Sequence, residues 1–130
     1  MATTEMNCLA GGGGSLINPQ TITQVDTRTE WSSPRTLQAT LTVGKTYTLV
    51  FSIYGSEGST VISNGGLNFD NCTGMDILNV SYGYIGVWSA FYTAVVVTFK
   101  ATDTSATLSI SPKSGISVSY YCGEILVQLD

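Results

Sequence analysis

Hydrophobic and polar residues alternate along most of this chain, which is the pattern of β-strands that bury one face. The clearest case is the stretch TLQATLTVGKTYTLVFSI, where the alternation runs over residues 36–43 and again over residues 46–53. The first run puts four apolar residues on one face, namely Leu37, Ala39, Leu41 and Val43. The pattern predicts two half-buried strands joined by a tight turn at Gly44-Lys45.

Further strands are predicted at short intervals along the rest of the chain. They cover residues 60–63 and 67–69 around an Asn64-Gly65-Gly66 hairpin turn, and then residues 76–84, 88–101, 106–111, 116–122 and 124–129. Residues 88–101 are apolar on both faces in their middle, which predicts a central strand covered on both sides. In residues 76–84 one face carries Leu78, Val80, Tyr82 and Tyr84, and in 124–129 one face carries Ile125, Val127 and Leu129. We expect Leu108 and Ile110 to point inward. No segment keeps a helical period over three turns, so the sequence predicts an all-β antiparallel sandwich.

The first residues differ in composition from the rest. Residues 1–15 are small and polar and include the four glycines 11–14, so we expect a glycine-rich arm, followed by the sandwich domain over residues 16–130. The arm is either a disordered tail or a segment that orders against a neighbouring subunit. The N-terminus lacks the pattern of a signal peptide, and the apolar run 90–99 is too short for a membrane helix. We therefore expect a protein that is made in a cytoplasm and is not embedded in a membrane.

The charge balance narrows the class of partner. Of the 130 residues, 43% are hydrophobic but only 11% are charged, against the usual quarter, and five lysines and arginines leave a net charge of −4. Hydroxyl and glycine residues fill the difference, which suits a surface that packs against copies of itself or faces glycans. Because binding to phosphates needs clustered cations, the sequence argues against a nucleic-acid partner and against an anionic membrane surface.

The sequence gives little support to catalysis or to a cofactor. Gly44-Lys45-Thr46 resembles the end of a phosphate loop, but that loop needs a glycine where Ala39 stands and a helix where a strand is predicted. The absence of histidine excludes Ser–His and Cys–His nucleophile pairs, and the nine acidic residues show no catalytic spacing. We expect no enzymatic activity and no cofactor. The three widely spaced cysteines are expected to be reduced, with a Cys72–Cys122 bridge as the alternative.

Two groups of residues are candidates for binding. The aromatic candidates for contact with a sugar or a protein partner are Trp31, Tyr54, Trp88 and Tyr92. Their alternative role is in the core, and Trp31 and Tyr54, which lie in or beside predicted loops, are the two best placed to be exposed. A weaker metal candidate combines Asp70, Asn71 and Asp76, whose oxygens suit a hard cation. Asp and Asn are also ordinary turn formers, which is the alternative for this second group.

Three segments carry a resemblance to a known superfamily. They are LTVGKTYTLVFSIYG, VWSAFYTAVVVTFKATDTSATLSIS and the closing GEILVQLD, and together they span roughly Leu16 to Asp130. The sequence resembles the jelly-roll modules of the carbohydrate-binding and galactose-binding-like superfamily, many of which occur in bacteriophage structural proteins. In the closing strand the family more often has an acidic pair, where this chain has only Glu124.

The resemblance implies a jelly-roll sandwich and a role in a virus particle. The expected function is a non-enzymatic virion structural protein, a phage capsid decoration, auxiliary or fibre-associated protein that binds other virion proteins and copies of itself, with a trimer as one expected assembly. The expected location is then the virion, after synthesis in the host cytoplasm. The alternative is a carbohydrate-binding module that recognises host or environmental glycans. These expectations rest on the family likeness, because one fold hosts many functions.

Overall fold

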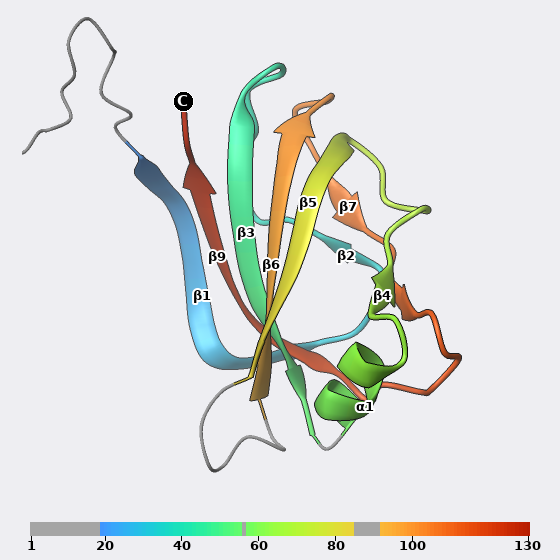
Figure 1. Ribbon diagram of the computed structural model, residues 1–130. Coiled ribbons are helices and arrows are strands. Elements are labelled where there is room, and N and C mark those ends of the chain that lie inside the picture. Colours follow the sequence, from blue (N-terminus) through green and yellow to red (C-terminus); the bar gives the residue numbers. More distant parts are fainter. Residues whose placement is uncertain (1–18, 56, 85–91) are drawn as a thin grey trace, which may run out of the picture.

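The computed structural model describes residues 19–55, 57–84 and 92–130, with only the backbone of Tyr84 and Tyr92. Its main feature is one antiparallel sheet in the order β1-β9-β3-β6-β5 (Figure 1). The five strands are β1 (Gln20–Trp31), β9 (Tyr121–Gln128), β3 (Thr46–Tyr54), β6 (Tyr92–Ala101) and β5 (Met75–Tyr84). Neighbouring strands in this order are all antiparallel.

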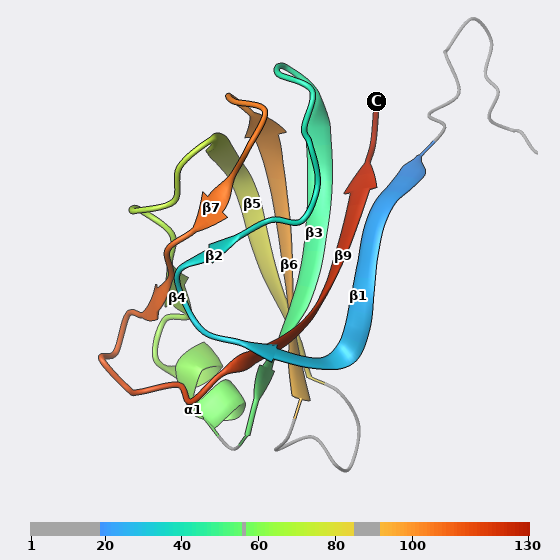
Figure 2. The same cartoon turned by 180° about the vertical axis from the view of Figure 1, so that it is seen from behind.

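A second, thinner layer covers one face of this sheet. It contains two short antiparallel pairs, β2 (Arg35–Thr36) with β7 (Thr107–Leu108) and β4 (Leu67–Asn68) with β8 (Ser111–Pro112), and the helix α1 (Glu57–Ser63). Figure 2 shows β2 and β7 in front of the sheet, whereas in Figure 1 they lie behind it. We call the covered face the inner face and the opposite one the outer face. The predicted all-β antiparallel sandwich is confirmed.

The core lies between the inner face and the thin layer. Strand β3 sends every second side chain into it, and β6 does the same. The buried side chains of these strands are Tyr47, Leu49, Phe51, Ile53, Val95, Val97 and Phe99, all 2% exposed or less. The thin layer contributes Leu37, Leu41, Val61, Leu67, Leu108 and Ile110 from the other side. The alternation predicted over residues 46–53 is therefore confirmed in β3, as is the inward position of Leu108 and Ile110.

The strand predicted over residues 36–43 is wrong beyond its first residue. Only Arg35–Thr36 pairs as a strand, and the chain then crosses the core as a loop. Leu37 N donates to Ala106 O at 2.9 Å and Leu41 N donates to Thr104 O at 2.8 Å, so the backbone is tied to a neighbouring loop. Leu37 and Leu41 are buried, whereas Val43 is 58% exposed. The loop buries Leu37 and Leu41, which are four residues apart. Because four is a multiple of two, a sequence that alternates between apolar and polar residues also has apolar residues at this spacing. The turn at Gly44-Lys45 is confirmed, because β3 begins directly after it.

The hairpin predicted around Asn64-Gly65-Gly66 is also wrong. Its first arm is helix α1, which buries Gly58 and Val61 on one side. The Asn-Gly-Gly segment ends this helix, and Gly66 N donates to Val61 O at 2.8 Å. Seven residues make only two turns, too few for a helical period to appear in the sequence.

Two β-bulges change which side chains of a strand point toward the core, one in edge strand β5 and one in the interior strand β9. Between Ile77 and Asn79 the β5–β6 register shifts, which leaves Leu78 55% exposed instead of aligned with Val80 and Tyr82. A second shift in the β3–β9 register turns Glu124 and Leu126 inward. Ile125 and Val127 then share the outer face. Within the residues described, no helix is long and apolar enough to cross a membrane.

Candidate functional site

Trp31, predicted to be exposed beside a loop, belongs to the core. Only 7% of it is exposed, and its ring stacks on Tyr121 at 4.9 Å between centroids and meets the edge of Phe51 at 5.2 Å. Its Nε1 donates a hydrogen bond to Gly123 O at 2.9 Å. The expectation of exposure is wrong, because Trp31 is the last residue of β1 and pairs with Tyr121 on the inner side of the sheet.

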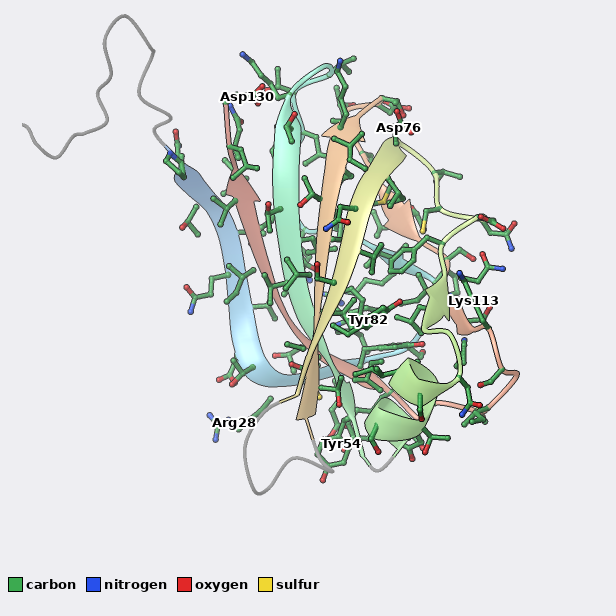
Figure 3. All side chains as sticks on the ribbon, in the orientation of Figure 1. Arg28, Tyr54, Asp76, Tyr82, Lys113 and Asp130 are labelled. Atoms are coloured by element: carbon green, nitrogen blue, oxygen red, sulfur yellow. The ribbon has the colours of Figure 1, made fainter. Side chains whose placement is uncertain are left out.

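Of the two aromatic candidates whose side chains are described, Tyr54 is the one that reaches the surface. It is half-buried at the end of β3, and its ring stacks on Tyr120 with centroids 4.6 Å apart and planes 15° apart. Figure 3 places it at the end of the sheet opposite to Asp76 and Asp130. Tyr92 is paired with Tyr54 in the β3–β6 register, but its side chain lies outside the described residues, as does all of Trp88. The structure thus places Tyr54 and Tyr92 on neighbouring strands, and Trp31 in the core.

The three residues of the weak metal candidate lie in two different elements. Asp70 and Asn71 are exposed in the turn after β4, where Asp70 N donates to Asn68 Oδ1 at 2.7 Å. Asp76 lies in β5, opposite Lys100 of β6 in the sheet register. In the described ranges no three residues among Cys, Asp and Glu form a cluster that could hold a metal ion. The hydrogen bond from Asp70 N to Asn68 Oδ1 belongs to a turn. The structure therefore supports the alternative role of Asp70 and Asn71 as turn residues.

A groove of about 510 Å³ runs between β4, β5 and the turn after β8. Its lining combines two aromatic rings, Phe69 and Tyr82, with polar and charged groups from Asn68, Asp70 and Lys113. The Tyr82 hydroxyl accepts a hydrogen bond from Leu67 N at 2.7 Å, which fixes the ring at the base of the groove. Figure 3 shows Tyr82 and Lys113 on this side of the molecule. The groove therefore offers stacking surface and hydrogen-bonding groups in one place.

The one acid of the closing strand, Glu124, is part of a buried ion pair. Its Oε1 accepts from Arg35 Nε at 2.9 Å, and its Oε2 accepts from Gln38 N at 3.1 Å. The Glu124 side chain is 1% exposed, and the Arg35 guanidinium lies 5.3 Å from the centre of the Trp31 ring. Among the described residues Arg35 Nη2 has no hydrogen-bond partner. Glu124 therefore ties β9 to β2 beneath the sheet and is not available to a ligand.

The outer face of the sheet is built in rows of side chains. In the central row, Val96 of β6, Val50 of β3 and Ile125 of β9 are direct cross-strand neighbours. The row ends at Ser81 on edge strand β5 and at Gln24 on edge strand β1. The three apolar residues are half-buried, whereas Ser81 and Gln24 are exposed. The central row is therefore apolar in the middle and polar at both edges.

The two flanking rows repeat this plan with smaller and more polar residues. On one side the row is Asn79, Thr98, Thr48, Val127 and Thr21. On the other side the row is Gly83, Ala94, Ser52, Cys122 and Glu30. A shallow hollow of about 150 Å³ lies beside the second of these rows, between Thr27, Val50, Ala94 and Ile125. No described element covers these rows, so the prediction that the central strand β6 is covered on both sides is wrong for the described part of the chain.

Comparison with protein-family models, with curated proteins and with solved structures finds no match for this chain. The resemblance seen in the sequence therefore stays a prediction.

Cys72 and Cys122 are both free, so the alternative bridge between them is not formed. Cys8 lies outside the described residues.

The sequence did contain a signal for the outer face. Residues 94 and 96 are apolar in a strand whose other face is apolar too, and Val50 interrupts the polar side of β3. A sheet face in contact with water usually carries polar residues at such positions. The groove gave no comparable signal, because its lining comes from segments that are distant in sequence.

Proposed function

We propose that this protein is a non-enzymatic structural component of a virus particle, a capsid decoration, auxiliary or fibre-associated sandwich that binds other virion proteins and copies of itself. The proposal joins the phage-protein resemblance of the sequence to the form of the outer face. Its location is then the virion.

One observation carries the proposal, namely the outer face with an apolar centre and a polar rim. An interface between proteins has this anatomy, with apolar side chains in the middle and polar side chains around them. A monomer gains nothing from leaving Val50, Val96 and Ile125 half in water, because each loses part of the free energy that full burial would provide. The scarcity of charge, 11% of all residues, supports the same conclusion.

The proposal is tested on purified particles. Virus particles from the culture that produces this chain are banded on a density gradient, and the protein content of the band is measured by mass spectrometry. We expect the chain in the particle band at a fixed ratio to the major shell protein. A chain found entirely in the unbanded fraction contradicts the proposal.

The second candidate function is glycan binding, which the groove between β4 and β5 favours. Sugars bind proteins through stacking on aromatic rings together with hydrogen bonds from amide and carboxylate groups, and Phe69, Tyr82, Asn68 and Asp70 offer these groups side by side. A surface module of a particle could carry both functions.

A glycan array distinguishes this candidate from the first. If the groove binds sugar, signals on the array disappear in a variant with Asp70→Ala and Lys113→Ala, two exposed residues whose removal leaves the core intact. The control is Tyr54→Ala, which removes an aromatic ring that does not line the groove. Loss of signal in the control alone moves the site to the Tyr54–Tyr120 pair, and an empty array contradicts glycan binding.

A further inference from the structure

We propose that the outer face pairs with the outer face of a second copy of this chain, so that two sheets pack back to back. This inference rests on the proposed function and names the partner of the surface on which that function is argued. It goes further because it commits to a two-fold pair and to the residues at its centre, the central row of Val96, Val50 and Ile125.

The first argument is that the face is complementary to itself. A two-fold interface brings the same patch of both copies together, so the patch must tolerate its own image. The central positions of the three rows hold aliphatic and hydroxyl side chains and the thiol of Cys122, and none of them is charged. The charged residues near the face lie at its ends and edges: Asp76 and Lys100 are opposite one another on β5 and β6, and Asp26, Arg28 and Glu30 lie on edge strand β1. Two such faces can meet without like charges at the centre.

The second argument is that the edges of the sheet are poorly suited to pairing. A second copy could also add to the sheet through a free strand edge, but bulges hinder such addition. Edge strand β5 has a bulge at Leu78. Edge strand β1 has two register shifts against β9, one between Thr21 and Thr23 and a longer one between Val25 and Glu30. The face is therefore a better surface than either edge for a regular contact.

The third argument is the size of the face. Five strands about 4.8 Å apart and about 26 Å long present about 600 Å² per copy. Two copies then bury about 1,200 Å² in total, which is the lower end of the range for specific interfaces. The packed sheets would lie about 10 Å apart with interdigitated side chains, and the hollow between Thr27 and Ile125 offers space for a side chain of the second copy.

The experiment measures the mass of the full chain in solution by light scattering and sedimentation across the micromolar range. We expect a dimer in the unmodified protein. Val96→Lys places a charge in the middle of the face and is expected to weaken the dimer by about 30-fold or more, because an unpaired charge would be buried. The matched control is Val43→Lys, which makes the same change at a valine that is 58% exposed in the loop before β3. The control is expected to stay dimeric.

A second variant and the alternative outcomes keep the inference testable. Thr98→Arg, at a half-buried hydroxyl position in a flanking row, replaces Val96→Lys as the decisive variant if circular dichroism shows that Val96→Lys does not fold. A monomer in the unmodified protein, a trimer, or a dimer that survives both face variants overturns the pairing. A monomer in which Val96→Lys exposes residues 1–18 to protease also overturns it and assigns the face to that segment. The proposed place of the chain in the virus particle is tested separately, by the presence of the chain in particles. It survives any of these results, whereas a monomer also removes the proposed binding between copies of the chain.

Discussion

At the scale of single residues, both the backbone conformation and the neighbouring atoms require a glycine at position 74. It adopts φ 76°, and a side-chain carbon built on it would overlap the carbonyl oxygen of Ser105. That carbonyl cannot move freely, because the adjacent Thr73 and Thr107 exchange two backbone hydrogen bonds. Gly44 has a similar φ of 89° but open space around it. A comparison of the two glycines therefore separates two contributions to the cost of adding a side chain. Both positions have the backbone strain, but only Gly74 has the collision.

We expect Gly74→Ala to destabilise the protein more than Gly44→Ala. The left-handed conformation costs an alanine about 1–2 kcal/mol at either position. At Gly74 the collision adds about 1–3 kcal/mol of overpacking. Urea unfolding of the two variants and the unmodified protein gives both losses. Equal losses would show that the loop around Ser105 moves aside without cost.

At the scale of elements, the Arg35–Glu124 pair is an ionic link between the thin layer and the sheet. It joins β2 to β9 through a contact with 13% and 1% of the side chains exposed. Breaking a buried pair by removing one partner leaves the other charge without compensation, which typically costs about 3–5 kcal/mol. Glu124→Ala also removes the acceptor for Gln38 N. We expect the single variants Arg35→Met and Glu124→Ala to be strongly destabilised.

A double-mutant cycle tests whether the two residues act as a pair. If they do, the loss in the double variant is smaller than the sum of the two single losses, by about 1–3 kcal/mol. Additive losses would indicate that each side chain contributes through separate contacts, such as the position of Arg35 over Trp31. The exposed pair Asp26–Arg28 is the control, since a pair on the surface is expected to show little coupling in the same cycle.

Elements also show what the sequence could predict and what it could not. Strand β3 was predicted with the correct alternation, because a strand with one buried face must alternate if its buried side chains are to meet a core. Residues 36–43 alternate as well, but they lack a neighbouring strand beyond Thr36 and form a loop held by Ala106 and Thr104. Alternation reports burial, whereas pairing decides whether a segment becomes a strand. The phase of β9 depends on its bulge, and a bulge has no clear signal in one sequence.

The candidate site was less predictable than the fold, because its residues lie at strand ends and in very short strands. Trp31 lies at the end of a strand, where its exposure depends on which way the next segment turns. The groove joins residues 65–70 to residue 113, which are brought together by the β4–β8 pair of two residues each. Pairs this short have no periodic pattern that a sequence could reveal.

At the scale of the whole molecule, the two layers are unequal in size, and among the described residues only the inner face of the sheet is covered. One sheet of five long strands is covered on its inner face by two-residue strands, a short helix and loops. The alternation and spacing of the strands predicted a sandwich, but they could not show that the second layer is so thin or which apolar residues meet at the centre of the outer face. The rows of that face depend on the register of all five strands, and register is a property of the assembled sheet.

The whole-molecule stability is expected to fall at alkaline pH. Burial raises the pKa of Tyr121 to about 12, and burial also raises the pKa values of the Cys72 and Cys122 thiols, with the charges of Asp70 and Glu30 acting in the same direction. The folded protein therefore holds protons that the unfolded chain releases, beginning with the thiols and then Tyr121. Because the folded pKa values are the higher ones, this stability is fully present at neutral pH and is lost as pH rises from about 9 to about 12.

Tyr121 contributes to the upper part of this range together with Tyr120, whose pKa is raised by desolvation and by its hydrogen bond with Tyr54. The rise in the pKa of Tyr121 from about 10 to about 12 corresponds to about 2–3 kcal/mol of unfolding free energy, which is lost between about pH 10 and 12. This loss of stability is measured from urea unfolding midpoints at a series of pH values. The variant Tyr121→Phe keeps the ring that stacks on Trp31 but removes the hydroxyl that titrates. The variant should lose less stability above pH 10 and show the same decline near pH 9 as the unmodified protein. Identical curves for both proteins would mean that Tyr121 ionises without unfolding the sheet, so that its hydroxyl reaches water in the folded state.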